Sequence, residues 1–144
     1  SYYTEARDDG AKRVEMTDYL LQSRFRKDNQ VYRENEDHIG FVFLFIQQLL
    51  IDQLEGNSEA GTLAKTVFTH ILNVFIDDFT ESLFNHNRSF LFKQVALMLR
   101  SFTELERVYY NVGKPVKGDV QIRAELNEAK DVSRQCVKIE SSCV

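Results

Sequence analysis

The sequence predicts an all-α protein, built as a single-domain helical bundle. Apolar residues recur every three or four positions over several long stretches, which is the spacing of one face of a helix. Residues that break helices are scarce, with six glycines and one proline, Pro115, among 144 residues. This length suits one domain with one sizeable core, and 43% apolar and 28% charged residues are typical of a globular protein.

The charge pattern limits the kinds of partner. The net charge is −4 and the charges are interspersed, whereas binding to phosphates needs a basic patch. We therefore expect no nucleic acid as a partner. A basic peptide is compatible with the negative net charge. The longest apolar run, residues 39–51, is interrupted by Gln47 and Gln48 and is shorter than the roughly 20 residues that span a bilayer. We expect no stable membrane insertion, and no secretory signal peptide opens the chain.

Both cysteines, Cys136 and Cys143, lie within the last nine residues. A disulfide framework would distribute its cysteines through the fold, and six intervening residues do not match the usual metal-binding spacings. We expect two free thiols and a cytoplasmic location, where thiols stay reduced.

The first two predicted helices cover residues 11–27 and 37–54. In the first, Val14, Leu21 and Phe25 share one face. The second is apolar nearly all round at its start, which is typical of a helix at the centre of a bundle. Its main stripe consists of Ile39, Val42, Phe43, Ile46, Leu50 and Leu54. Its opposite face carries Phe41, Leu44 and Phe45. Gly56 suits a left-handed cap at its end.

The next two predicted helices cover residues 61–84 and 90–110, with Ser89 suited to cap the latter. The third carries an apolar stripe in steps of four. The stripe of the fourth alternates steps of four and three, which predicts a seam packed against another helix. That stripe consists of Leu91, Val95, Met98, Phe102, Leu105 and Tyr109. The domain organisation we predict is a helical core over residues 1–112 and a charged C-terminal extension over residues 113–144, a loop followed by a short helix near 125–134.

The sequence offers no familiar catalytic or metal motif. A di-iron bundle needs a glutamate three residues before a histidine, but Asn35, Val67 and Leu83 stand at these positions. There is no His-Glu-x-x-His pattern, no glycine-rich phosphate loop and no nucleophile on a sharp turn. We therefore expect no cofactor and no enzymatic activity. His70 is expected to be a packed or boundary residue with a backbone partner, and Asp77 with Asp78 a solvated face that could also attract a basic partner.

The segment 34–40 reads Glu34-Asn35-Glu36-Asp37-His38-Ile39-Gly40 and precedes the most apolar helix. Asn35 suits the N-cap, and Glu36 and Asp37 in the first turn would complement the positive end of the helix dipole. Helix physics does not explain His38, because a charged imidazole is disfavoured there. Two interpretations stay open: a capping acid with a histidine that donates to a nearby carbonyl, or a binding site.

Residues 34–54 resemble the signature of the TorD/DmsD/NarJ-like family of cytoplasmic chaperones for molybdenum-containing redox enzymes. That signature is Glu-Pro-x-Asp-His, followed by an aliphatic residue and an apolar helix. Here Asn35 stands where the family has proline. His70 downstream and the aromatic-led helix that starts at Phe90 add to the resemblance, which covers roughly residues 30–110.

The resemblance implies a TorD-like bundle without the N-terminal helices of the full family fold, and it allows a domain-swapped homodimer. It implies a chaperone that binds the twin-arginine signal peptide and the apo form of a molybdenum-containing oxidoreductase, and delays export until the cofactor is inserted. Asp37 and His38 match family positions associated with leader binding. We add Glu34 and Glu36, since carboxylates bind arginine in bidentate geometry. Phe41, with Phe45, would line an apolar groove if no neighbour covers it.

Two alternatives remain at the level of sequence. The first is a non-catalytic helical interaction or regulatory module with no signal-peptide role, in which Asp37 and His38 only cap a helix. The second is an enzyme such as a nucleotide hydrolase, for which the sequence lacks a phosphate loop.

Overall fold

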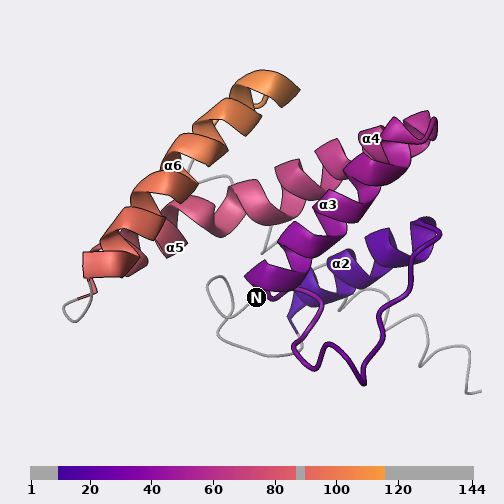
Figure 1. Cartoon of the computed structure of the whole chain (residues 1–144), viewed down its shortest axis with the longest axis horizontal. Helices are drawn as coiled ribbons and strands as arrows, with labels where there is room; N and C mark the ends of the chain where they lie inside the picture. The colour runs from indigo at the N-terminus through magenta and orange to yellow at the C-terminus, as the bar shows by residue number, and fades with distance from the viewer. Residues whose placement is uncertain (1–9, 87–89, 116–144) are drawn as a thin grey trace, which may run out of the picture. The chain divides into compact units, whose positions relative to one another are not determined.

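A computed structural model describes residues 10–86 and 90–115. The chain divides into two units, Ser1–Gly113 and Lys114–Val144, and the first is described below. All of its described regular elements are helical, which confirms the predicted all-α class. None of these helices has the length and apolarity to cross a membrane. In chain order they are α2 (Ala11–Gln22), α3 (Ile39–Leu54), α4 (Ser58–Val67), η1 (Phe68–Leu72), α5 (Asn73–Phe84) and α6 (Phe90–Tyr110) (Figure 1).

The C-terminal predictions, namely the loop and short helix after residue 115 and the roles of Cys136 and Cys143, lie outside the described residues, as does Ser89. The division between residues 1–112 and 113–144 therefore stays a prediction.

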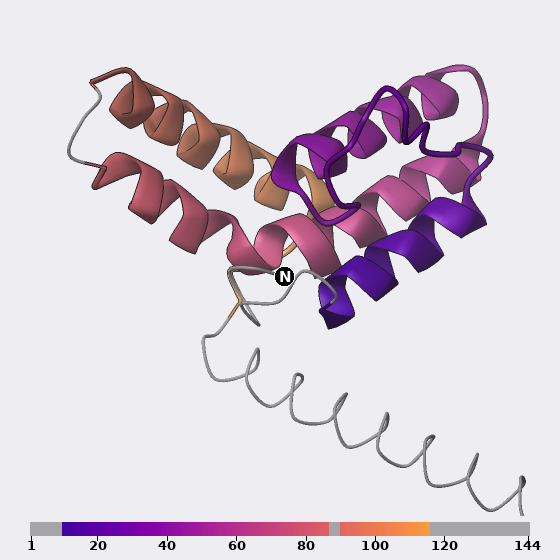
Figure 2. The same ribbon diagram turned by 90° about the horizontal axis from the view of Figure 1, so that it is seen from below.

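The core forms where α4 lies between α2 and α3 (Figure 2). Helix α3 contributes the largest share of the core, five of the fifteen buried side chains, in agreement with its nearly uniform apolar character. Burial of these side chains removes apolar area from water, which is the main stabilising term in folding. The buried members of this cluster are Met16, Leu20, Phe41, Val42, Phe45, Ile46, Leu49, Ala60, Ala64, Val67, Phe68, Ile71, Leu72, Ile76 and Tyr110.

Helix α2 ends at Gln22, five residues before the predicted end at residue 27, so that boundary was wrong. Ser23 takes an extended conformation, with ψ at 169°, and its hydroxyl donates to the carbonyl of Leu20. The guanidinium of Arg26 then donates to the carbonyls of Ser23 and Phe25, at 2.8 and 2.6 Å. The bonds to Leu20 and Ser23 satisfy carbonyls at the C-terminal end of the helix, where no helical N–H is available.

Helices α4 and α5 are joined through η1, a π-helical turn in the middle of one continuous helical run. At its end the N–H of Asn73 donates to the carbonyl of Phe68, five residues back. The sequence predicted one helix over residues 61–84, and the run instead begins at Ser58 and contains this wider turn. Such turns add one residue to a helix and shift the faces that follow. The buried positions thus continue in steps of four through the whole run, from Ala60 and Ala64 in α4 to Ile76 and Thr80 in α5.

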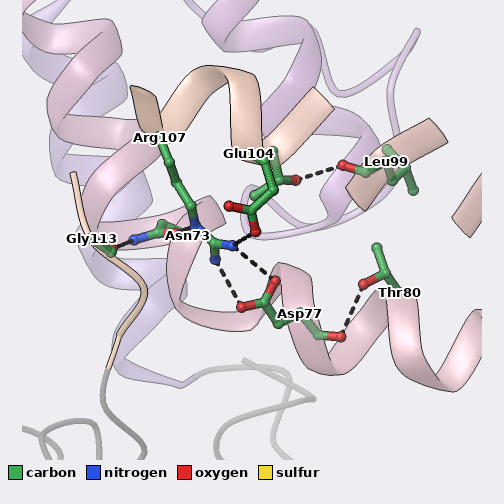
Figure 3. Close-up of polar contacts among 8 residues, drawn as sticks. Asn73, Asp77, Thr80, Leu99, Glu104, Arg107 and Gly113 are labelled. Carbon is green, nitrogen blue, oxygen red and sulfur yellow. Dashed lines mark hydrogen bonds and ion pairs between the residues drawn. The ribbon is translucent and has the colours of Figure 1, made fainter. Parts of the chain in front are cut away.

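Small or polar residues are buried at the interface where α5 and α6 meet. Ala96 and Thr103 of α6 are buried, as are Asn73 and Thr80 of α5. At its base Arg107, with 4% of its side chain exposed, reaches from α6 to α5 (Figure 3). Its Nη1 and Nη2 donate to both carboxylate oxygens of Asp77, at 3.2 and 2.9 Å.

Two further bonds complete the arginine's surroundings. Its Nε donates to Oδ1 of Asn73 at 2.8 Å, and Nη1 also donates to Oε1 of Glu104 at 2.9 Å. The amide of Asn73 donates in turn to the carbonyl of Gly113, at 3.1 Å. Asp77 was predicted to lie on a solvated face, and its side chain is indeed 46% exposed. The sequence did not indicate that the same carboxylate is the bidentate partner of a buried guanidinium.

The apolar stripe of α6 lies on the side opposite this interface. The sequence predicted that the stripe packs against another helix, but among the described residues most of its surface is open to solvent. The exposed fractions are 66% for Leu91, 37% for Val95, 72% for Met98, 40% for Phe102, 69% for Leu105 and 70% for Tyr109. The ring of Phe43 in α3 contacts the stripe, with its centroid 5.8 Å from that of Phe102. Helix α6 thus buries its small and polar face and exposes its apolar one.

Candidate functional site

The predicted site lies on the segment that joins α2 to α3. Tyr32 closes a turn there, with its N–H donating to the carbonyl of Asp28 at 2.9 Å. Its ring packs against Phe41, with centroids 5.4 Å apart, and its hydroxyl lies 3.0 Å from Nδ1 of His38. Phe41 thus supports Tyr32 from the core, and Tyr32 holds the imidazole of His38.

His38 is the N-cap of α3, and its side chain makes the capping bond. The N–H of Gly40 donates to Nδ1 at 3.2 Å, and the Tyr32 hydroxyl points to the same nitrogen. A nitrogen that accepts these bonds carries no proton, so the ring proton is on Nε2. The helix starts at Ile39, two residues later than predicted, and neither Glu36 nor Asp37 lies in its first turn. The assignment of Asn35 as the cap was therefore wrong.

Gly40 leaves space for this arrangement. A Cβ at this position would lie 2.9 Å from the Tyr32 hydroxyl and 3.3 Å from Nδ1 of His38. Any larger residue would push these two groups apart, so the glycine permits the contact between Tyr32 and His38.

Glu36 holds the segment against the rest of the unit. Its two carboxylate oxygens accept from Lys27 and Arg13, each at 2.9 Å, and only 15% of its side chain is exposed. Burial by itself raises the pKa of the Glu36 carboxyl, but the hydrogen bonds from Lys27 and Arg13 outweigh it and lower the pKa to about 2. Lys27 also donates to the carbonyl of Glu34. The charge of Glu36 is therefore neutralised within the protein, by its ion pairs with Arg13 and Lys27.

This lowered pKa gives a testable dependence of stability on pH. The carboxylate form of Glu36 stabilises the fold above its unfolded pKa of 4.5, and this contribution is lost as the pH falls from there toward 2. We expect Glu36→Gln to lower the free energy of unfolding by about 2 kcal/mol at pH 7. The difference from the wild type should shrink below pH 4.5, measured by urea unfolding at a series of pH values. A difference that is constant down to pH 3 would contradict the role of the charge.

The other predicted residues differ in exposure. The side chain of Glu34 is exposed, and that of Asp37 is partly exposed directly before the cap. Phe41 is 5% exposed and stacks on Phe45, which is 3% exposed, with ring centroids 6.5 Å apart. The sequence predicted an apolar groove beside these two rings only if no neighbour covers them. Both rings are covered, so they do not line an open groove. Lys27 also lies over the Phe41 ring, 5.6 Å from its centroid.

A second cluster, around His70, was not found from the sequence. The Tyr19 hydroxyl donates to Oε1 of Glu15 at 2.8 Å and lies 2.9 Å from Nδ1 of His70. Lys12 bonds to the other Glu15 oxygen at 2.7 Å and to the carbonyl of His70 at 2.9 Å. Burial, and then Glu15, raise the pKa of Tyr19. Lys12, Glu15 and Tyr19 stand three and four residues apart, a spacing that could have indicated a shared polar face.

The described residues contain no group of three or more His, Cys, Asp or Glu side chains arranged to hold a metal ion. The segment 32–38 offers carboxylates, the imidazole of His38 and the phenol of Tyr32, together with the guanidinium of Arg33 and the amide of Asn35. These groups bind by hydrogen bonds and, where they are charged, by ion pairs.

Comparison with known proteins decides the family. The family model described as nitrate reductase delta subunit matches residues 1–81, more than half of the chain. The chain belongs to this family. No curated protein and no solved structure matches it.

Membership confirms the resemblance to TorD/NarJ-like chaperones that the segment 34–54 indicated. Nitrate reductase delta subunit proteins are redox-enzyme maturation chaperones, which act on molybdoenzyme subunits and are not catalysts. The matched range contains α2 to η1 and most of α5, and therefore both histidine clusters described above.

Proposed function

We propose that this delta-family protein acts in the cytoplasm, where it binds the twin-arginine signal peptide of a molybdenum-containing oxidoreductase and delays export until the cofactor is inserted. The observation that carries the proposal is the fixed His38 next to two accessible carboxylates, on Asp37 and Glu34, in a chain of this family.

The proposed chemistry is recognition of guanidinium groups. Arginine presents planar pairs of N–H donors that match a carboxylate in bidentate geometry. The positive end of the α3 dipole opposes a cation, so at least one carboxylate is needed to make its approach favourable. Glu34 and Asp37 supply this charge, and the neutral imidazole of His38 adds a polar group of fixed orientation.

Glu36 and Phe41 take supporting roles in this proposal. Glu36 is neutralised by Arg13 and Lys27, and Phe41 is buried beneath Tyr32. We assign both to the positioning of the segment that carries Glu34, Asp37 and His38, because neither offers a free surface to a leader.

Changing Asp37 and His38 together to alanine is expected to weaken leader binding at least tenfold, or about 1.4 kcal/mol. The variant loses one carboxylate and the imidazole while the core of α3 is untouched. Isothermal titration calorimetry with a synthetic twin-arginine peptide would measure the affinity, and circular dichroism the helix content.

The matched control is Glu59→Ala, which removes the same charge at an exposed position in the first turn of α4. A second control replaces the paired arginines of the peptide with lysines, which keep the charge and lose the bidentate geometry. If the doubly changed protein is folded and binds the leader as tightly as the wild type, the proposed site is wrong.

One observation favours the alternative, an interaction module without a leader-binding role: His38 already has a structural task as the N-cap of α3. The variant His38→Asn separates the two, because asparagine is a good N-cap but lacks the imidazole. Under the capping alternative His38→Asn leaves the protein unaffected. Under our proposal it preserves stability and weakens leader binding.

A further inference from the structure

We propose that α6 is a dimerisation surface, on which the apolar stripe Leu91, Val95, Met98, Phe102, Leu105 and Tyr109 packs against the same stripe of a second copy of this chain, in antiparallel orientation. In this pairing each copy keeps its own fold, and no helices are exchanged between copies.

The first support is the inverted character of α6. Its buried positions against α5 are small or polar, including Ala96, Thr103 and the paired Arg107. Tyr110, at the end of the helix, is buried against Phe68, but most of the other large apolar side chains of α6 face solvent. Helices normally bury their apolar stripe and expose their polar face. A fully exposed large side chain has roughly 200 Å² of accessible surface. Weighted by their exposed fractions, the six stripe residues together expose apolar surface on the order of 700 Å².

That area suits a protein partner. The largest apolar patch of a typical monomer covers roughly 300–600 Å². A stable interface between two proteins buries about 800 Å² on each side. The stripe therefore exceeds what most monomers leave exposed and comes close to what one side of a stable dimer contributes.

The second support is the spacing. Steps of four, three, four, three and four residues keep the stripe on a two-helix seam, the pattern of coiled coils. The stripe spans about 27 Å of helix. It is also symmetric about position 100. A two-fold axis there places Leu91 opposite Tyr109, Val95 opposite Leu105, and Met98 opposite Phe102, so each layer joins an aliphatic side chain to a larger or longer one.

The third support is the absence of charge on the stripe. None of its six residues is charged, and charged residues are depleted at the core of protein interfaces. The basic residues in the first half of α6, Lys93 and Arg100, lie over the Phe84 ring of α5 instead, 5.8 and 5.1 Å from its centroid. An antiparallel pair also aligns the two helix dipoles favourably.

Sedimentation velocity of the full 144-residue chain over a wide range of concentrations tests the proposal. We expect a monomer–dimer equilibrium in which Met98→Glu and Leu105→Glu each raise the dissociation constant at least about 100-fold, because the two-fold axis places each change in the interface twice. Both positions are about 70% exposed, at 72% and 69%, so neither change leaves a hole in the core. Val31→Glu, at an 83% exposed apolar position in the segment before α3, is the matched control and should leave the equilibrium unchanged.

Cysteine cross-linking tests the orientation, in a background in which Cys136 and Cys143 are changed to serine. A Leu91→Cys chain mixed with a Tyr109→Cys chain should form a mixed disulfide under mild oxidation, because the antiparallel pair brings these positions together. Disulfides only between two Leu91→Cys chains would overturn the antiparallel arrangement.

A chain that stays monomeric at every concentration, or a dimer that persists in both glutamate variants, would overturn the proposal itself. If the wild-type chain is monomeric and Met98→Glu abolishes leader binding, the stripe belongs to the client instead. Leader binding by the wild-type protein is measured separately, so failure of the dimer leaves the proposed function standing.

Discussion

Asp77→Ala is expected to lower the free energy of unfolding by about 3 kcal/mol, because it leaves the guanidinium of Arg107 buried with only part of its bonds. Arg107 has 4% of its side chain exposed and makes two of its four described side-chain bonds to Asp77. The loss is measured by chemical denaturation at neutral pH. Asp78→Ala is the matched control, an exposed aspartate one residue further along α5, and is expected to cost under about 1 kcal/mol.

A double-mutant cycle on Asp77 and Arg107 tests whether the two residues act as a pair. Arg107→Met removes the buried charge together with its need for partners, so Asp77→Ala should cost little in that background. The double variant is therefore expected to be more stable than the sum of the two single losses predicts. Strict additivity of the two losses would show that Asp77 and Arg107 do not act as a pair.

Phe68→Ala is expected to cost about 4 kcal/mol, the largest effect of an apolar truncation that we predict. The ring is 1% exposed at the start of η1, and its centroid lies 5.3 Å from that of Tyr110 in α6. Its loss leaves a cavity at the point where α4, η1 and α6 meet, which the surrounding helices cannot fill without moving. Thermal unfolding followed by circular dichroism measures the effect.

Phe90→Ala is the control for Phe68→Ala, since it removes the same ring from a position that is 79% exposed. It should change the stability by less than about 0.5 kcal/mol. Equal losses in the two variants would mean that Phe68 does not lie in the core.

Helix identity was predictable because periodic apolar residues report which side of a helix is buried. The limits of α6 and the left-handed Gly56, with φ at 107°, followed from local sequence. The end of α2 did not, because it depends on Arg26 folding back onto carbonyls that precede it. The π turn was also missed, since its cost is balanced only by packing on both sides of it.

At the candidate site, the sequence drew attention to the correct segment but not to the roles within it. Local rules favour Asn35 as a cap, yet Tyr32 and Gly40 together give that place to His38. The engagement of Glu36 depends on Arg13, 23 residues earlier, and the partner of Asp77 lies 30 residues later. Contacts over such separations are set by the tertiary fold and leave no mark on a local pattern.

The π turn makes the number of residues between α4 and α5 as important as their identity. Removal of a single residue from 68–72 would let the run wind as a regular α-helix and would rotate α5 by about 100° relative to α4. Asn73 and Asp77 would then turn away from Arg107, although each would still be present. Relatives of this protein should therefore accept substitutions in this turn far more readily than a change in its length.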